Sequence, residues 1–207
     1  MTRAKSGDLV AIYADESCIG NGREGDNPGG AGGLIEWLHP KSNKVTRCDY
    51  WISERATTNN RMALRSVIEA FQEISRRGNS YRVLFTSDSK YIVDGMNEWL
   101  PNWKARDWKK NGGPILNLEL WQEADEVVSD HEVQWRWVRG HNGQPQNEYA
   151  NFLATQAAGE QTNSGGLRES EFDSWVAAQK AGTVDLKNMA PFPDLQSFQP
   201  SKRAWTI

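Results

Sequence analysis

With 207 residues, the chain is long enough for one domain with a substantial core plus an extension. Its 24 basic and 27 acidic residues nearly balance at a net charge of -3, so it has no overall basic field and any nucleic-acid-binding surface must be local. The sequence has no apolar run long enough for a membrane span and no signal-type segment, and its two cysteines are too few for a disulfide framework or a zinc site, so we expect a cytoplasmic protein with free thiols.

The first part of the chain predicts an antiparallel meander of three strands. Apolar runs over residues 8–14, 32–38 and 45–52 are typical of strands, and the connections between them are hairpin-like. The first run ends at Asp15 and Glu16. The first strand therefore delivers acidic side chains to its carboxyl end.

A glycine-rich stretch between the first two strands contains residues 20–25, GNGREG, a literal match to the dinucleotide-binding pattern. That pattern requires a helix to open directly after it, so that phosphate meets the helix amino terminus. Here more glycine and Pro28 follow, and then a strand. We therefore interpret the stretch as a long hairpin loop and not as a cofactor site.

A long amphipathic helix is predicted from Thr58 to about Arg77. Threonine can cap its first turn, and apolar side chains then recur at helical spacing, at Leu64, Val67, Ile68, Phe71 and Ile74. The first turn is polar, with Asn59, Asn60 and Arg61, and can hydrogen-bond bases or phosphates. It carries no carboxylate.

Residues 81–86 predict a fourth strand, which is followed by Asp88 and by a helical stretch from Lys90. Asp15 and Asp88 thus lie at or just beyond the carboxyl ends of two strands. Open α/β sheets place their sites at this edge.

Residues 97–113 are both basic and aromatic. One interpretation is that the rings belong to the core and the lysines to a solvated face. However, four cations fall within seven residues and alternate with rings, and cations meet phosphates while rings lie against sugars or bases. We therefore favour a nucleic-acid strand-binding surface, made of Trp99, Trp103, Lys104, Arg106, Trp108, Lys109 and Lys110.

The remaining elements are two helices, one strand and a tail. The helices are expected over residues 115–129 and 146–159, the half-buried strand over 132–138, and a loop with His141 between strand and helix. After a polar linker, Phe172, Trp175 and Val176 suggest a short amphipathic helix. For the irregular end of the chain we favour packing on the domain or disorder over partner binding.

The order of these elements, together with their motifs, resembles type 1 ribonuclease H of the bacterial kind. The matching stretches are residues 15–21, 57–62, 86–91, 135–141 and 146–151. The resemblance implies an α/β ribonuclease H-like fold over residues 8–159, with a five-stranded mixed sheet (three antiparallel strands, then two parallel) flanked by helices. It leaves residues 160–207 as an extension of unassigned role.

The resemblance also implies a monomeric endonuclease that hydrolyses the RNA strand of RNA/DNA hybrids with two Mg²⁺ ions, Mn²⁺ being the alternative. In-line cleavage needs a water activated on one side and a leaving oxygen stabilised on the other, and two cations about 4 Å apart supply both. Asp15 would bridge both metals, Asp88 and Asn151 would complete the metal ligands, and His141 would assist proton transfer or product departure.

By the same resemblance, Asn21, Asn59, Asn60 and Lys90 would recognise the 2′-hydroxyls of the RNA strand. The DNA strand would be held by Thr58 and Trp99, and the basic protrusion would add Trp103, Lys104 and Trp108.

Two positions depart from the family pattern. The helix carboxylate falls at Ala63, and the last acidic ligand falls at Asn151, which still offers a neutral oxygen. Glu16 is a conceivable replacement, but adjacent residues of a strand point to opposite faces, which argues against it. Losing a ligand predicts a rate lower by roughly a thousandfold. We therefore expect binding with little cleavage, favour an alanine introduced into a functional enzyme, and keep a natural non-catalytic hybrid-binding module as the alternative.

Overall fold

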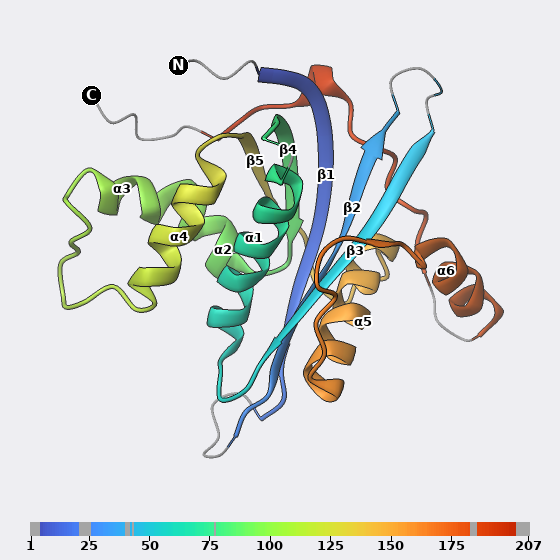
Figure 1. The fold of residues 1–207 in the computed structure, drawn as a ribbon, viewed down its shortest axis with the longest axis horizontal. Coiled ribbons are helices and arrows are strands. Elements are labelled where there is room, and N and C mark those ends of the chain that lie inside the picture. Colours follow the sequence, from blue (N-terminus) through green and yellow to red (C-terminus); the bar gives the residue numbers. More distant parts are fainter. Residues whose placement is uncertain are drawn as a thin grey trace.

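A mixed sheet in the order β5-β4-β1-β2-β3-β6 crosses the middle of the molecule, with helices on both of its faces (Figure 1). This computed structural model describes residues 5–20, 26–39, 42, 44–76, 78–182 and 186–201, with side chains from residue 8. None of the helices within these ranges is long and apolar enough to cross a membrane.

The strands follow the predicted topology. β1 (Lys5–Cys18), β2 (Gly29–Leu38) and β3 (Val45–Glu54) form the antiparallel meander. β4 (Ser80–Ser87) runs parallel to β1, and β5 (Glu132–Trp137) runs parallel to β4. The three antiparallel and two parallel strands of the predicted sheet are therefore confirmed. Residues 21–25 of the glycine stretch, which we interpreted as a hairpin loop, lie outside the described ranges.

One short strand was not predicted. β6 (Arg168–Glu169) pairs with Cys48 and Asp49 at the free edge of β3 and makes the sheet of the described residues six-stranded. A pair of charged residues carries no strand periodicity, so only the packing of the neighbouring segment places it there.

The helices lie in two layers. On one face of the sheet α1 packs against α4, and on the other face α5 covers β1 and β2 (Figure 1). A single helical stretch runs from α2 through a π-helical turn into α3. The bounds are α1 (Asn59–Ser75), α2 (Lys90–Asp94), the π-helical turn (Gly95–Trp99), α3 (Leu100–Lys104), α4 (Leu118–Val128), α5 (Pro145–Glu160), α6 (Phe172–Ala181) and a 3-10 turn (Leu195–Ser197).

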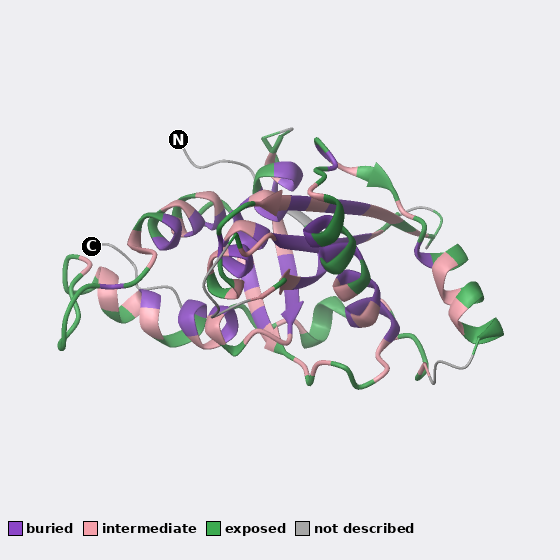
Figure 2. Cartoon of the chain, turned by 90° about the horizontal axis from the view of Figure 1, so that it is seen from below, coloured by how far each residue is buried: buried purple, intermediate pink, exposed green. Residues whose placement is uncertain are grey.

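Strand alternation divides the core between the two layers. Ile12 and Ala14 of β1 pack in the cluster that contains Leu64 of α1. Ala11 and Tyr13 pack in the cluster that contains residues of α5. Figure 2 shows the buried residues concentrated along the central strands and the inner sides of these helices. The same alternation continues to the end of β1, where the acidic residues lie.

The described residues 186–201 near the C-terminus pack on the domain, which is one of the two outcomes that we favoured over partner binding. After α6 the chain crosses back from the α6 side toward β5 (Figure 1). Phe192 packs against the α5-side cluster, and the Ser201 N–H donates to the Val133 carbonyl at 2.8 Å. This segment therefore covers part of the sheet that α5 leaves open.

Candidate active site at the carboxyl edge of the sheet

Asp15 and Asp88 meet because their strands are parallel neighbours. The last β1–β4 register pair is Ala14 with Ser87, so each aspartate is the next residue after that pair. Asp15 is 7% exposed and Asp88 is half-buried, and their carboxyl groups hydrogen-bond to each other. Burial, and then the charge of Asp88, raises the pKa of Asp15 far above its usual value. Burial likewise raises the pKa of Asp88.

Glu16 also belongs to this acidic group. Burial and the nearby charge of Asp88 raise its pKa to about 8, and the Ser89 side chain hydrogen-bonds to it. Its backbone N–H donates to Asp15 Oδ1 at 2.7 Å. Three carboxylates therefore lie within electrostatic reach of one another at the ends of β1 and β4.

The side on which Glu16 lies follows from strand alternation. Glu16 pairs with Ala31 of β2, which packs against Met62 of α1. Glu16 is therefore on the α1 side, with Ala14, and Asp15 is on the α5 side. In addition, burial raises the pKa of Tyr50, whose hydroxyl is 2.9 Å from Ser66 Oγ of α1, and the charges of Glu69 and Glu16 add to this rise.

Ala63 is 2% exposed and lies in the α1-side core cluster with Ala14. Strand alternation therefore does not exclude Glu16 as a replacement for an acid at position 63. Adjacent residues do point to opposite faces, but a carboxylate on α1 would come from the α1 side, and Glu16 points to that side. Strand alternation places the Glu16 side chain on the α1 side of the sheet. This is the side on which Ala63 leaves the family's carboxylate position without an acid.

Asn151 lies half-buried on α5, on the other side of the site. Asp15 pairs with Gly32, where an added Cβ would lie 2.6 Å from Leu153 Cβ and 2.8 Å from the Ala154 backbone nitrogen. The absence of a side chain at Gly32 thus lets α5 approach β1 and β2 closely. Asn151 is one turn before Ala154, on the helix that covers the Asp15 side of the sheet.

The loop after β5 closes over Asp88. The Val138 N–H donates to the Ser87 carbonyl at 3.1 Å, and Trp137 Nε1 donates to the Asp88 carbonyl at 3.0 Å. A Cβ at Gly140 would lie 1.9 Å from Asp88 Oδ2, so a larger residue there would displace the Asp88 carboxylate. His141 follows with φ +49°, and its charge opposes the burial that raises the pKa of Asp88. The predicted histidine therefore lies within electrostatic reach of the predicted aspartate.

The donor set fits a divalent cation in part. Asp15 and Asp88 hydrogen-bond to each other, and burial together with their mutual repulsion opposes ionisation of both. A divalent cation between them would offset this repulsion, and magnesium prefers carboxylate oxygens as ligands. In the described part of the chain no three His, Cys, Asp or Glu side chains already converge in metal-binding geometry. Asp15 and Asp88 are thus the preformed pair, and Glu16 and Asn151 are the additional oxygen donors on either side.

Three of the residues expected to contact the hybrid can be placed relative to this edge. Thr58 caps α1, accepting the Arg61 N–H at 3.3 Å, as its sequence predicted. Asn60, in the same turn, is exposed. Lys90 Nζ lies 5.1 Å from the centre of the Trp137 ring, next to the Asp88 loop. Asn59 lies in the first turn of α1, and Asn21 lies outside the described residues.

The basic and aromatic region combines both interpretations given to it. Trp121 is fully buried, and Trp99, Trp103 and Trp108 are partly buried against the core. Lys104 forms an ion pair with Asp125 of α4 at 2.8 Å. The rings therefore anchor the α2–α3 stretch on α4, and they still leave surface for contact.

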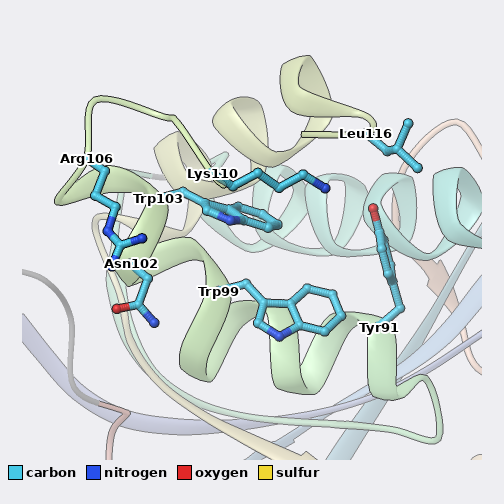
Figure 3. Close-up of a pocket in the computed structure, with 7 residues that line it drawn as sticks. All are labelled: Tyr91, Trp99, Asn102, Trp103, Arg106, Lys110 and Leu116. Atoms are coloured by element: carbon cyan, nitrogen blue, oxygen red, sulfur yellow. The ribbon is translucent and has the colours of Figure 1, made fainter. Parts of the chain in front are cut away.

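A pocket of about 470 Å³ opens on this surface (Figure 3). It is lined by Tyr91, Trp99, Asn102, Trp103, Arg106, Lys110 and Leu116. Its cations are Arg106 and Lys110, while Trp99 and Trp103 supply flat walls. Cations and aromatic rings therefore share one concave surface, as a site that binds a nucleic-acid strand requires. Tyr91 and Asn102 were not identified from the sequence, since neither stands out in its own segment.

Comparison with known proteins shows which family the chain belongs to. The RNase H family profile matches residues 7–159. A ribonuclease H of Stutzerimonas stutzeri is 43% identical over 152 residues, which cover 73% of this chain and 92% of the relative. A ribonuclease H of Bordetella pertussis is 45% identical over 152 residues, covering 72% and 89%.

Among solved structures, LC9-RNase H1 is 56% identical with a TM-score of 0.87, covering 97% of this chain and 95% of that one. It is described as a type 1 RNase H with the type 2 active-site motif. The prototype foamy virus RNase H domain, at 21% identity and a TM-score of 0.58 over 75% of this chain and 97% of that one, shares the fold. This chain belongs to the ribonuclease H family.

Proposed function

We propose that this protein is an endonuclease that cleaves the RNA strand of RNA/DNA hybrids with two Mg²⁺ ions, and that Glu16 supplies the carboxylate missing at Ala63. The observation that carries the proposal is the acidic edge formed by Asp15, Glu16 and Asp88 beside the His141 loop. Family membership supplies the reaction class, and the placement of Glu16 on the α1 side supports activity in this chain.

The metal ligands divide between the two sides of the sheet. Asp15, Asp88 and Asn151 would hold the ions from the α5 side, and Glu16 would hold them from the α1 side. The ions would activate the attacking water and stabilise the leaving oxygen. Ser89 holds the Glu16 side chain through its hydrogen bond, and Gly140 leaves room for the Asp88 carboxylate.

The protein side chains around the ions orient the substrate and move protons. His141, on the loop that touches Asp88, would take part in proton transfer or product departure, because imidazole changes charge near neutral pH. Asn59, Asn60 and Lys90 would contact the RNA strand through its 2′-hydroxyls. The pocket with Trp99 would hold the DNA strand, with Arg106 and Lys110, two cations already expected from the sequence, in its lining.

The alternative function is a hybrid-binding module without catalysis. It rests on Ala63, which leaves α1 without an acid in its first turns. The placement of Glu16 favours the enzyme. Both functions predict hybrid binding, and only the enzyme predicts cleavage.

The test is cleavage of a hybrid labelled on its RNA strand, with Mg²⁺, by the full chain and by Asp88→Asn. We expect products with 3′-hydroxyl and 5′-phosphate ends from the full chain, no cleavage of single-stranded RNA or double-stranded DNA, and hybrid binding without cleavage by Asp88→Asn. Binding by the full chain with cleavage no faster than Asp88→Asn would instead establish the binding module. Ala63→Glu would then show whether the missing acid is the reason.

A further inference from the structure

The segment over residues 186–201, here called the strap, makes two separate sets of contacts. Its first part lies against the loop that carries His141 and the first turn of α5. Its last part lies along β5. The two sets join different parts of the domain, so they can be disrupted separately.

The first part of the strap ties down the end of the His141 loop. The Lys187 N–H donates to the Gly143 carbonyl at 2.8 Å. Gln146, which is fully buried, donates from Nε2 to the Ala190 carbonyl at 2.8 Å and accepts the Ala190 N–H on Oε1 at 3.2 Å. One side-chain amide therefore satisfies both backbone groups of a strap residue.

The loop is held from the opposite side by α5. The Gly143 N–H donates to Glu148 Oε1 at 2.9 Å. Both backbone groups of Gly143 are thus bonded, one to α5 and one to the strap. His141 lies two residues earlier, with φ +49°, and Gly143 has φ +73°. A loop in this left-handed conformation needs external bonds to keep one geometry, because side chains other than glycine rarely adopt it unaided.

We propose that the strap is a positioning element for His141, so that the extension beyond the ribonuclease H domain forms part of the catalytic apparatus. The inference rests on the proposed function for its kinetic consequence. With the strap bonded, the loop keeps His141 beside Asp88. Without those bonds, the loop samples other conformations, and fewer of them place the imidazole for proton transfer or product departure.

The chain offers a matched pair of variants. Gln146→Leu removes both bonds to Ala190 at the loop end of the strap. Gln134→Leu makes the same chemical change at the other end, where Gln134 Oε1 accepts the Gln199 N–H at 2.9 Å. Gln146→Leu should lower kcat by about tenfold with little change in KM, because fewer loop conformations then place the imidazole for the reaction. Gln134→Leu should leave kcat unchanged.

A double-mutant cycle with His141→Ala separates positioning from a general loss of stability. If the strap acts through the histidine, Gln146→Leu should lower kcat in the wild-type background and have no further effect in the His141→Ala background. An equal fold-loss in both backgrounds, or an equal loss in Gln134→Leu, would overturn the proposal.

Hydrogen exchange gives a readout that does not need activity. Amides of residues 139–143 should exchange faster in Gln146→Leu than in Gln134→Leu, and unchanged exchange would overturn the proposal. If Gln146→Leu does not fold, Ala190→Pro removes the N–H donated to Gln146 in an irregular segment and should show the same effects at smaller size. If the full chain does not cleave hybrids, the proposed function and the kinetic role of the strap are both overturned. If it cleaves hybrids but the effects of Gln146→Leu and His141→Ala are additive, only the proposed role of the strap is overturned.

Discussion

Replacing Glu16 with glutamine tests whether this side chain is there for catalysis or for the fold. The pKa of Glu16 is raised from 4.5 to about 8, so at pH 7 the metal-free folded protein must keep a proton that the unfolded chain releases. Each pKa unit corresponds to about 1.4 kcal/mol, so this cost is at most about 3 kcal/mol at pH 7. Glutamine is neutral in both states and avoids it.

Glu16→Gln should therefore be more stable than the wild type in chelator at pH 7, by about 1 to 3 kcal/mol and about 2 to 10 °C in Tm. Its hybrid cleavage should fall by roughly a thousandfold, about 4 kcal/mol of transition-state stabilisation, because one metal loses a carboxylate ligand. A residue that is costly to the apo fold and necessary for the rate is characteristic of a functional site.

The assays are thermal unfolding in chelator and single-turnover cleavage of a labelled hybrid with Mg²⁺. Glu54→Gln is the matched control, since Glu54 is also half-buried, stands at the same end of the sheet and pairs with Arg65 at 2.9 Å. It should keep nearly the full rate. If Glu16→Gln cleaves like the wild type, Glu16 is not a metal ligand, and if it loses stability and activity together, the role of Glu16 is structural.

Three further predictions concern the surroundings of the site. Gly140→Ala should lower kcat by about a hundredfold, measured by single-turnover cleavage, because a Cβ there would lie 1.9 Å from Asp88 Oδ2 and must displace a reacting group. Arg106→Gln and Lys110→Gln should each weaken hybrid binding and reduce the slope of log affinity against log salt by about 1, and an unchanged slope would remove these cations from the interface. In chelator, the stability of the fold should fall as pH rises from 4.5 toward about 8, because the folded protein favours the protonated form of Glu16. The increase in Tm that Mg²⁺ produces should therefore grow from pH 6 to pH 8. A constant increase in Tm would contradict an acidic metal site.

Much of the fold could be predicted because its signals are local and periodic. The apolar runs gave the five principal strands, and the threonine before a periodic apolar stretch gave the start of α1 at the Thr58 cap. β1 proved longer than its apolar run, since Glu16 and Cys18 continue the ladder with β2 through backbone bonds that have no sequence signature.

A site residue could be predicted from the sequence only where its type and its position at the end of a strand were enough to identify it. Asp15 and Asp88 follow from two parallel strands, and the structure brings them together. Glu16 could not be placed from the sequence. Strand alternation predicts that its side chain points to the opposite face from that of Asp15, but it does not predict which helix covers that face. That required the three-dimensional position of α1, which the pairing of Ala31 with Glu16 and its packing on Met62 reveal.

The strap was beyond reach for a different reason. Residues 186–201 have neither helical nor strand period, so nothing in their sequence relates them to the loop after β5. Gln146 at the start of α5 is an ordinary polar residue in the sequence, and its burial becomes visible only with its two bonds to Ala190.

Our claim that Glu16 takes the place of an acid at position 63 can be tested by single-turnover cleavage of an RNA/DNA hybrid by Glu16→Gln with and without Ala63→Glu. Both side chains belong to the α1 side of the same edge, so a glutamate on α1 should return at least about tenfold of the lost rate to Glu16→Gln. A double variant that is no faster than Glu16→Gln would contradict the claim.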